Sequence, residues 1–103
     1  MIKHKFNAKP TEVDGIRFDS KMESNYFKKL KLRQEAGEVI FFLRQCPLHL
    51  PGNVKYVVDF VEFLSDNSVS FIDVKGYDTP MSKLKRKQTE AIYPIKINVV
   101  TKV

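Results

Sequence analysis

The sequence lacks three features that would each point to a particular class of protein. It has one cysteine, Cys46, which cannot form an internal disulfide and cannot by itself build a zinc site. It has no apolar run near the roughly 18–20 residues that span a bilayer. Its basic start, residues 1–6, has no apolar segment of the kind that a signal peptide needs. We therefore expect a protein of a reducing compartment, most simply the cytoplasm, with no membrane segment.

Acidic residues are in the minority. Twelve Asp and Glu face eighteen Lys and Arg, so the formal net charge is +6. A chain of 103 residues can bury one hydrophobic core but not two. A small basic domain has a reason to bind polyanions such as nucleic acid. We expect residues 1–14, which carry Lys3, Lys5 and Lys9, to form a basic N-terminal arm, and residues 15–103 to form a single domain.

The periodicity predicts two helices and four strands. Ser20 followed by Glu23 is a capping box, which predicts a helix over residues 20–36. Thr79 and Pro80 open a second helix that ends before Tyr93-Pro94. Runs rich in β-branched and aromatic residues predict strands over residues 39–43, 54–64, 69–75 and 95–100. At 100° per residue, one face of the second helix collects the residues that we expect to point inward, which are Met81, Leu84, Gln88, Ala91 and Ile92.

The predicted element order is helix, three strands, helix, strand. The second and third strands should form an antiparallel hairpin, because turn residues separate them. The final strand–helix–strand unit should be a right-handed crossover with parallel strands. The sequence therefore predicts an α/β fold with a mixed sheet flanked by helices.

Two aspartates interrupt predicted strands, where this residue type is rare. They are Asp59 and Asp73, and a carboxylate inside a sheet is costly unless it is paired or binds a metal. Lys75 lies two residues after Asp73, so both side chains point to one face, about 6–7 Å apart. Two converging carboxylates suit a hard divalent cation such as Mg²⁺. A neighbouring ammonium could orient the attacking water or neutralise charge on a phosphate.

Whether Asp59 joins this pair depends on the register of the hairpin. If Leu64 faces Val69, Asp59 opposes Val74 and points to the wrong face. If Ser65 faces Val69, Asp59 opposes Lys75 and the side chains converge. The site hypothesis therefore requires a hairpin loop of odd length, or a bulge.

Asp59, then Asp73-Val74-Lys75 after a short hairpin, resembles the signature of the PD-(D/E)XK nuclease superfamily, and the predicted αβββαβ order matches its core. Residues 11–21, 73–76 and 83–87 are similar to a small phage-encoded family of predicted endonucleases. The likeness covers residues 11–100. One difference is that Cys46-Pro47 follow Gln45, where the phage family more often has proline directly after glutamine, which leaves the role of Gln45 open.

The resemblance implies a restriction-endonuclease-like fold and a set of site residues. Asp59 and Asp73 would bind Mg²⁺ or Mn²⁺, with the Val74 carbonyl as a third ligand, and Lys75 would activate or orient the hydrolytic water. An acid of the first helix would support the metal or its waters, and Glu23 occupies that place. The structural alternatives are a simple ion pair between Asp73 and Lys75 and a capping role alone for Glu23.

The second helix carries weaker candidates. Gln88 could contact water or phosphate, or it could satisfy a backbone group at the helix margin. Three basic residues share one side of this helix and are candidate DNA-phosphate contacts, although charged runs are most often solvated helix faces; they are Lys83, Arg86 and Lys87.

The resulting prediction is a divalent-metal-dependent endodeoxyribonuclease. The chain has no helix-turn-helix, zinc finger or long groove-reading loop, which favours recognition of DNA structure over DNA sequence. By fold-level analogy we expect resolution of four-way (Holliday) junctions in DNA recombination, by a homodimer, in a phage-infected bacterial cytoplasm. No small-molecule substrate is expected. The alternatives are a nicking or flap endonuclease of phage replication or packaging, and a non-catalytic DNA-binding module on the same fold.

Overall fold

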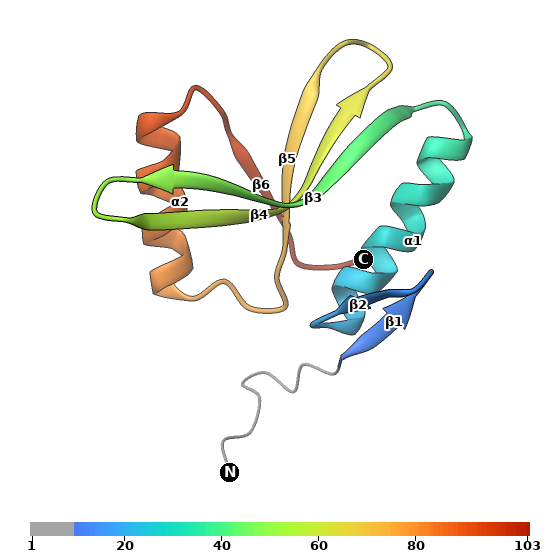
Figure 1. Ribbon diagram of the computed structural model, residues 1–103, viewed down its shortest axis with the longest axis horizontal. Coiled ribbons are helices and arrows are strands. Elements are labelled where there is room, and N and C mark those ends of the chain that lie inside the picture. The colour runs from blue at the N-terminus through green and yellow to red at the C-terminus, as the bar shows by residue number, and fades with distance from the viewer. Residues whose placement is uncertain (1–9) are drawn as a thin grey trace.

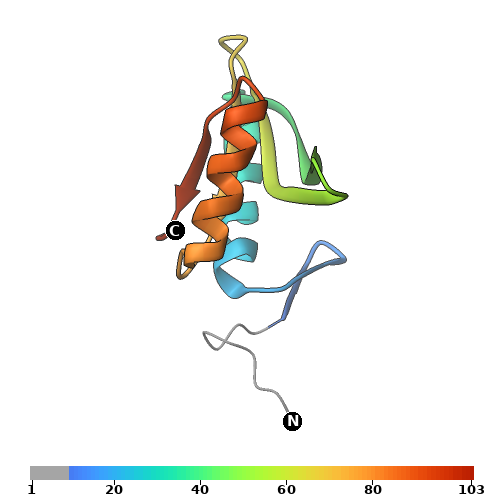
Figure 2. The same ribbon diagram turned by 90° about the vertical axis from the view of Figure 1, so that its left-hand side faces the viewer.

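The computed structural model describes residues 10–103, and their fold is α/β. A small hairpin of β1 (Thr11–Val13) and β2 (Ile16–Phe18) precedes α1 (Lys21–Glu35), β3 (Val39–Leu50), β4 (Val54–Leu64), β5 (Val69–Val74), α2 (Pro80–Ile92) and β6 (Ile97–Val100). The main sheet has the order β3-β4-β5-β6, and the β5–β6 pair alone is parallel. The predicted α/β class and mixed sheet are confirmed, with α1 and α2 on opposite sides of the sheet (Figures 1 and 2).

Both helices begin at the predicted caps. The Ser20 hydroxyl oxygen accepts a hydrogen bond from the Glu23 amide at 3.1 Å, and the Thr79 hydroxyl oxygen accepts one from the Ser82 amide at 3.1 Å. Each bond satisfies an amide that the first helical turn leaves without a partner. Helix α1 ends at the C-cap Ala36, and Gly37 follows with φ +84°, a left-handed conformation that glycine adopts at little cost.

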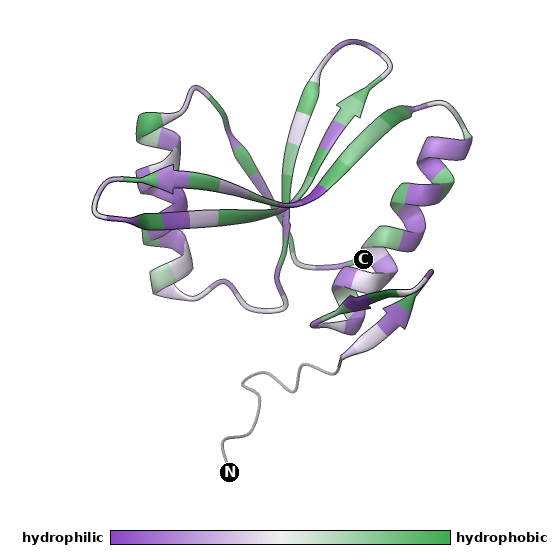
Figure 3. Cartoon of the chain, viewed as in Figure 1, coloured by the Kyte–Doolittle hydropathy of each residue, from purple (hydrophilic) through white to green (hydrophobic). Residues whose placement is uncertain are grey.

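The core has two parts, because the sheet twists strongly at its centre. Helix α1 packs on one part, which consists of Phe18, Phe27, Leu30, Val39, Phe60, Ile72 and Val74. The second part lies towards the β3–β4 turn and consists of Leu50, Tyr56, Val58, Val61 and Ile97. Near Asp59, strand β4 therefore changes which of its two faces packs into the core. Figure 3 shows the apolar residues concentrated along the strands, whereas both helices are largely polar.

Strand β3 extends further than predicted. The predicted strand ends at residue 43, but β3 continues through Pro47 to Leu50. This is possible because β3 lies at the edge of the sheet, where a residue without an amide hydrogen is tolerated. Strand β6 is shorter than predicted and begins at Ile97.

The predicted boundary of the N-terminal arm is wrong. Residues 11–13 are not part of an arm but form β1, which pairs with β2. The turn between them is Asp14-Gly15, with φ +53° and +77°, the conformation of a two-residue hairpin turn. This dipeptide is a strong local signal for a hairpin. The rest of the predicted arm, residues 1–9, lies outside the described residues.

The predicted inward face of α2 is also wrong. The residues expected to be buried are exposed, and they are Met81, Leu84, Gln88, Ala91 and Ile92; the one buried residue of α2 is Thr89. The opposite side of the helix is fixed by polar contacts. Glu90 accepts a hydrogen bond from the Ile97 amide at 2.7 Å, and Arg86 forms two bonds with Asp78. These contacts orient α2 with its apolar side outward.

No helix within residues 10–103 is long and apolar enough to cross a bilayer.

Replacing Ser20 with alanine removes the N-cap acceptor of α1 without changing the core. We expect the free energy of unfolding to fall by about 1 kcal/mol, as measured by urea denaturation. Ser65→Ala, at an exposed turn serine, is the control and should change stability by less than about 0.5 kcal/mol. Equal losses in the two variants would contradict a capping role for Ser20.

Candidate functional site

The candidate site forms where β4 and β5 separate. Phe63 pairs with Val69, and the register continues to Phe60 opposite Ile72. Residues 64–68 therefore form the loop between the paired positions. This loop has five residues, an odd number, and its length differs from the loop length that either register considered above would give. One step further along this register, Asp59 comes opposite Asp73. The hairpin thus meets the condition that the site hypothesis set, because opposed residues share a face.

The two aspartates bind the backbone of each other's strand. The Val74 amide donates to Asp59 Oδ2 at 2.9 Å, and the Asp59 amide donates to Asp73 Oδ1 at 3.0 Å. Regular pairing of β4 with β5 ends at Phe60 and Ile72, so the carboxylates take over the role of backbone carbonyls at this point. One oxygen of each carboxylate is therefore held in place by a backbone amide. This is a rigid way to fix two acids beside each other.

A third carboxyl group comes from α1. Glu23 lies in the first turn of that helix and is buried. The Gln45 side-chain amide lies 3.2 Å from Glu23 Oε2 and 3.3 Å from Asp59 Oδ1, so it bridges the two acids. The structure therefore brings Glu23, Asp59 and Asp73 into one cluster, as the sequence predicted. The Glu23 amide bonds to the helix cap, and its carboxylate reaches this cluster. The capping role and the role in the site are therefore compatible.

Lys75 and Tyr56 contact the remaining oxygen of Asp73. Lys75 Nζ lies 3.9 Å from Asp73 Oδ2, and the Tyr56 hydroxyl donates to the same oxygen. The predicted proximity of Lys75 to Asp73 is confirmed. Asp73 itself is only 1% exposed. A buried carboxylate with an adjacent, partly exposed ammonium fits both a structural ion pair and a catalytic pair.

Burial makes this cluster reluctant to carry its full negative charge. Burial, and then the charge of Asp59, raise the pKa of Glu23 from 4.5 to about 7. Burial also raises the pKa of Asp59 and that of Asp73, although backbone hydrogen bonds and the charge of Lys75 act in the opposite direction. Neighbouring acids with raised pKa values hold a proton or attract a cation.

The donors of this cluster are oxygens, which suits a hard cation. Within residues 10–103, no group of three or more His, Cys, Asp and Glu side chains is arranged to hold a metal ion. Two carboxylates are nevertheless what Mg²⁺ commonly takes from a protein, since waters and substrate phosphate complete its shell. The residues present therefore fit Mg²⁺ or Mn²⁺ at Asp59 and Asp73. The Val74 amide anchors Asp59, and the role of the Val74 carbonyl stays a prediction.

The predicted DNA contacts on α2 differ in their surroundings. Arg86 forms bonds of 3.1 and 2.5 Å with the Asp78 carboxylate. Burial raises the pKa of Asp73, and the charge of Arg86 partly opposes that rise. Lys83 and Lys87 are exposed. Arg86 thus lies close enough to influence the acids, but its guanidinium is already paired.

Gln88 lies elsewhere. It lines a separate concavity of about 350 Å³ between α2 and the β3–β4 turn, with Leu50, Pro51, Val54, Ala91 and Ile92. None of the described residues that line this concavity belongs to the acidic cluster. The structure therefore does not bring Gln88 to the predicted site.

Two residues lie beside Glu23, of which sequence reasoning missed Arg44 and left the role of Gln45 open. Arg44 stacks on the Phe18 ring, 4.5 Å from its centroid, and lies 3.8 Å from Glu23 Oε2; its Nε is buried and has no hydrogen-bond partner. Gln45 has φ +51°, a conformation that costs a residue with a side chain about 1–2 kcal/mol. The register of β3 against β4 is the same on both sides of Gln45. Nothing in the spacing of Arg44 and Gln45 indicates these roles.

Glu23 makes stability depend on pH. A pKa raised above the unfolded value contributes stability below pH 4.5 that is lost as the pH rises through about 7. We expect the free energy of unfolding in metal-free buffer to fall by about 2–3 kcal/mol between pH 5 and pH 8, as measured by urea denaturation in EDTA. Glu23→Gln should remove most of this loss, and identical pH profiles for the two proteins would contradict the assignment.

The left-handed backbone at Gln45 should reverse the usual order of stability in a strand, in which an alanine variant is more stable than a glycine variant. Gln45→Gly and Gln45→Ala both delete the amide, but glycine accepts the left-handed conformation. We expect the glycine variant to be more stable than the alanine variant by about 1 kcal/mol in urea denaturation. At Lys55, an exposed position of β4, the order should be the reverse. The same order at both positions would show that Gln45 is not strained.

Comparison with known proteins gives a family without a stated activity. A family model described as "Protein of unknown function (DUF1064)" matches residues 3–103, so the chain belongs to this family. No curated protein and no solved structure matches the chain. Any activity must therefore be argued from the site itself.

Proposed function

We propose that this DUF1064 chain is a divalent-metal-dependent endodeoxyribonuclease with a restriction-endonuclease-like fold. The observation that carries the proposal is the position of Asp59 and Asp73, opposite each other where β4 and β5 separate, with Lys75 Nζ 3.9 Å from Asp73. The order α1-β3-β4-β5-α2-β6 is compatible with that fold. The proposal extends the sequence resemblance, and the comparisons with known proteins leave it open.

Asp59 and Asp73 would hold Mg²⁺ or Mn²⁺, with the Val74 carbonyl as the third protein ligand. A bound ion of this kind supplies Lewis-acid polarisation of the scissile phosphate and neutralises charge that develops on it. The protein's contribution is rigidity. The amides of Val74 and Asp59 fix one oxygen of each aspartate, so the carboxylates need little rearrangement on binding.

The other residues of the cluster would manage water and protons. The Lys75 ammonium orients the attacking water or balances charge on the phosphate. Burial raises the pKa of Glu23 to about 7 in the metal-free site, and a bound cation would favour its ionised form, which can accept a proton from that water. Hydrolysis then forms one phosphorus–oxygen bond and breaks another, and the leaving oxygen takes up a proton. Gln45 keeps Glu23 beside Asp59 during these steps.

DNA would be held mainly through its phosphates. Lys83 and Lys87 are exposed on α2, which follows directly after the strand that carries Asp73, and Arg86 lies near that aspartate. Phosphate contacts position a duplex but carry no sequence information. The described residues include no separate base-reading element, which favours recognition of DNA structure.

We take four-way junctions as the leading substrate and a homodimer as the leading assembly, so that two strands are cut symmetrically. This part of the proposal rests on analogy with nucleases of similar size and fold. It places the protein in DNA recombination in the cytoplasm of a phage-infected bacterium.

Asp73→Asn is the direct test of catalysis. Asparagine keeps the shape and can still accept the Asp59 amide, but it removes the charge that holds a cation. We expect cleavage in Mg²⁺ or Mn²⁺ to fall by at least about 100-fold, while DNA affinity in a gel-shift assay changes little. The measurement is a cleavage time course on four-way junctions, flaps, forks and linear duplex.

Asp66→Asn is the matched control, because Asp66 is an exposed aspartate in the β4–β5 loop; it should cut at the wild-type rate. A wild-type protein that binds DNA but cuts no substrate with either metal would support the non-catalytic module instead. Preference for flaps over junctions would retain the nuclease and replace its substrate.

A further inference from the structure

One face of the main sheet is apolar and uncovered. Two rows of directly opposed residues run across β3, β4 and β5 on this face: Leu43, Val61 and Phe71 form one, and Phe41, Phe63 and Val69 form the other. The Phe41 and Phe63 rings stack at 4.3 Å. Phe41, Leu43 and Val69 are each nearly half exposed. An exposed apolar surface of this kind marks an interaction site.

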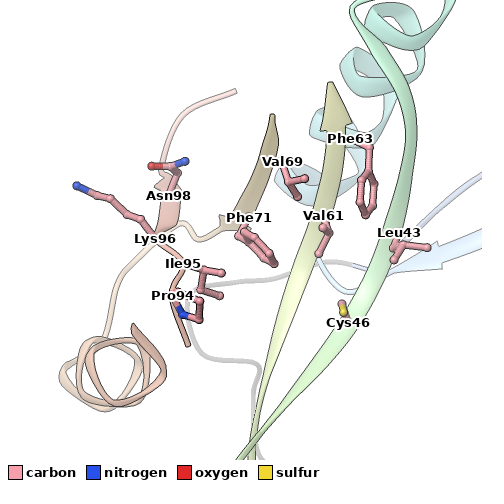
Figure 4. A pocket seen from close by; sticks show the side chains of 10 residues that line it. All are labelled: Leu43, Cys46, Val61, Phe63, Val69, Phe71, Pro94, Ile95, Lys96 and Asn98. Atoms are coloured by element: carbon pink, nitrogen blue, oxygen red, sulfur yellow. The ribbon is translucent and has the colours of Figure 1, made fainter. Parts of the chain in front are cut away.

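This face is also concave. A hollow of about 730 Å³ lies over it, and Figure 4 shows the side chains of Leu43, Val61 and Phe71 lining it. Pro94 and Ile95, which connect α2 to β6, form one wall. Among the described residues that line the hollow, Lys96 alone is charged. A concave, nearly uncharged surface requires a convex apolar partner.

The architecture indicates what kind of partner this is. An antiparallel sheet can leave one face in water when that face is polar, but an apolar face is unfavourable there, and helices usually cover it in α/β proteins. Helix α1 covers the other face of this half of the sheet through Phe27 and Leu30. Helix α2 lies on this side of the sheet, but within residues 10–103 no helix covers the part of the face that carries Phe63 and Phe71. The hollow therefore has the position of a missing helix.

Helix α2 packs on the sheet through one side only. Helix α2 turns an apolar ridge outward, formed by Met81, Leu84 and Ile92, each at least half exposed. The spacing of these residues places them on one side of the helix. A helix of 13 residues is about 20 Å long, which exceeds the roughly 14 Å between the outer two of four strands spaced about 4.8 Å apart. The helix is therefore long enough to cross the hollow, and the ridge and the hollow match in polarity and in shape, one convex and the other concave.

We propose that the hollow over β3, β4 and β5 binds the α2 ridge of a second copy of this chain. The α2 ridge of the first copy enters the hollow of the second, so that one two-fold axis buries both surfaces. This reciprocal contact is closed, whereas a one-way contact of ridge and hollow would polymerise. The net charge of +6 opposes self-association and Lys85 flanks the ridge, but the three ridge side chains are uncharged and Lys96 is the one charged residue among the described residues lining the hollow. The proposal gives an interface to the homodimer of the proposed function, but it does not depend on DNA cleavage.

Charge substitutions at each surface test the pairing. Leu43 in the hollow is 46% exposed and Leu84 on the ridge is 50% exposed, so glutamate at either position stays in contact with water in the monomer. By sedimentation equilibrium, the wild type should have twice the chain mass of 12.0 kDa. Leu43→Glu and Leu84→Glu should each weaken the dimer by about 100-fold or more, with unchanged circular dichroism.

Leu32→Glu is the matched control, because Leu32 is 63% exposed but lies on α1; it should leave the dimer intact. A monomeric wild type at high concentration would overturn the proposal, as would a dimer that resists the substitutions at both surfaces. Loss of the dimer with only one of the two substitutions would also overturn the reciprocal contact. Open polymers of the wild type would do the same.

The single native cysteine supplies a second test. Cys46 lines the hollow, so a new cysteine on the ridge should meet the partner's hollow. Under mild oxidation, two thiols lose two electrons to the oxidant and two protons to the solvent as a disulfide forms. Leu84→Cys should give a covalent dimer on a denaturing gel. Leu32→Cys should not, and adding Cys46→Ser to Leu84→Cys should abolish the product. Survival of the product without Cys46 would contradict the proposed contact.

Discussion

The structure depends on the exchange of hydrogen bonds between Asp59 and Asp73 across the point where β4 and β5 part. Each carboxylate accepts a backbone amide of the opposite strand, and these bonds continue the strand pairing just beyond Phe60 and Ile72. The sheet can therefore open without leaving those amides unsatisfied. The cost is two buried acids side by side, whose pKa values are raised. A cation would relieve that cost, so the same interaction that supports the fold also prepares a site.

Local signals in the sequence predicted the parts that local chemistry controls. Ser20 and Thr79 marked the helix starts because capping involves residues only three apart. Asp59 and Asp73 were recognisable because carboxylates are rare in strands. The hairpin register was left open, since one residue of slip reverses every side chain. The five-residue connection that the structure adopts, from Phe63 to Val69, differs from both alternatives but brings the acids together.

The errors arose where tertiary contacts outweigh local pattern. The apolar face of α2 predicted burial, but its polar side is fixed inward, because the Ile97 amide donates to Glu90 and Arg86 donates to Asp78. No periodicity encodes those bonds. Arg44 was missed and the role of Gln45 was left open for a related reason, because both residues reach Glu23 only through the long-range pairing of β3 with β4. The exposed ridge of α2 becomes reasonable if its partner is the uncovered face of the sheet in a second copy.

The central claim is that Asp59 and Asp73 together bind a divalent cation. Anomalous diffraction from a crystal soaked in Mn²⁺ tests it most directly, because manganese occupies magnesium sites and can be located without prior assumptions. We expect a peak within about 2–2.5 Å of a carboxylate oxygen of each aspartate. A crystal that shows Mn²⁺ elsewhere, with both aspartates still bonded only to Tyr56, Gln45, Lys75 and the strand amides, would contradict it.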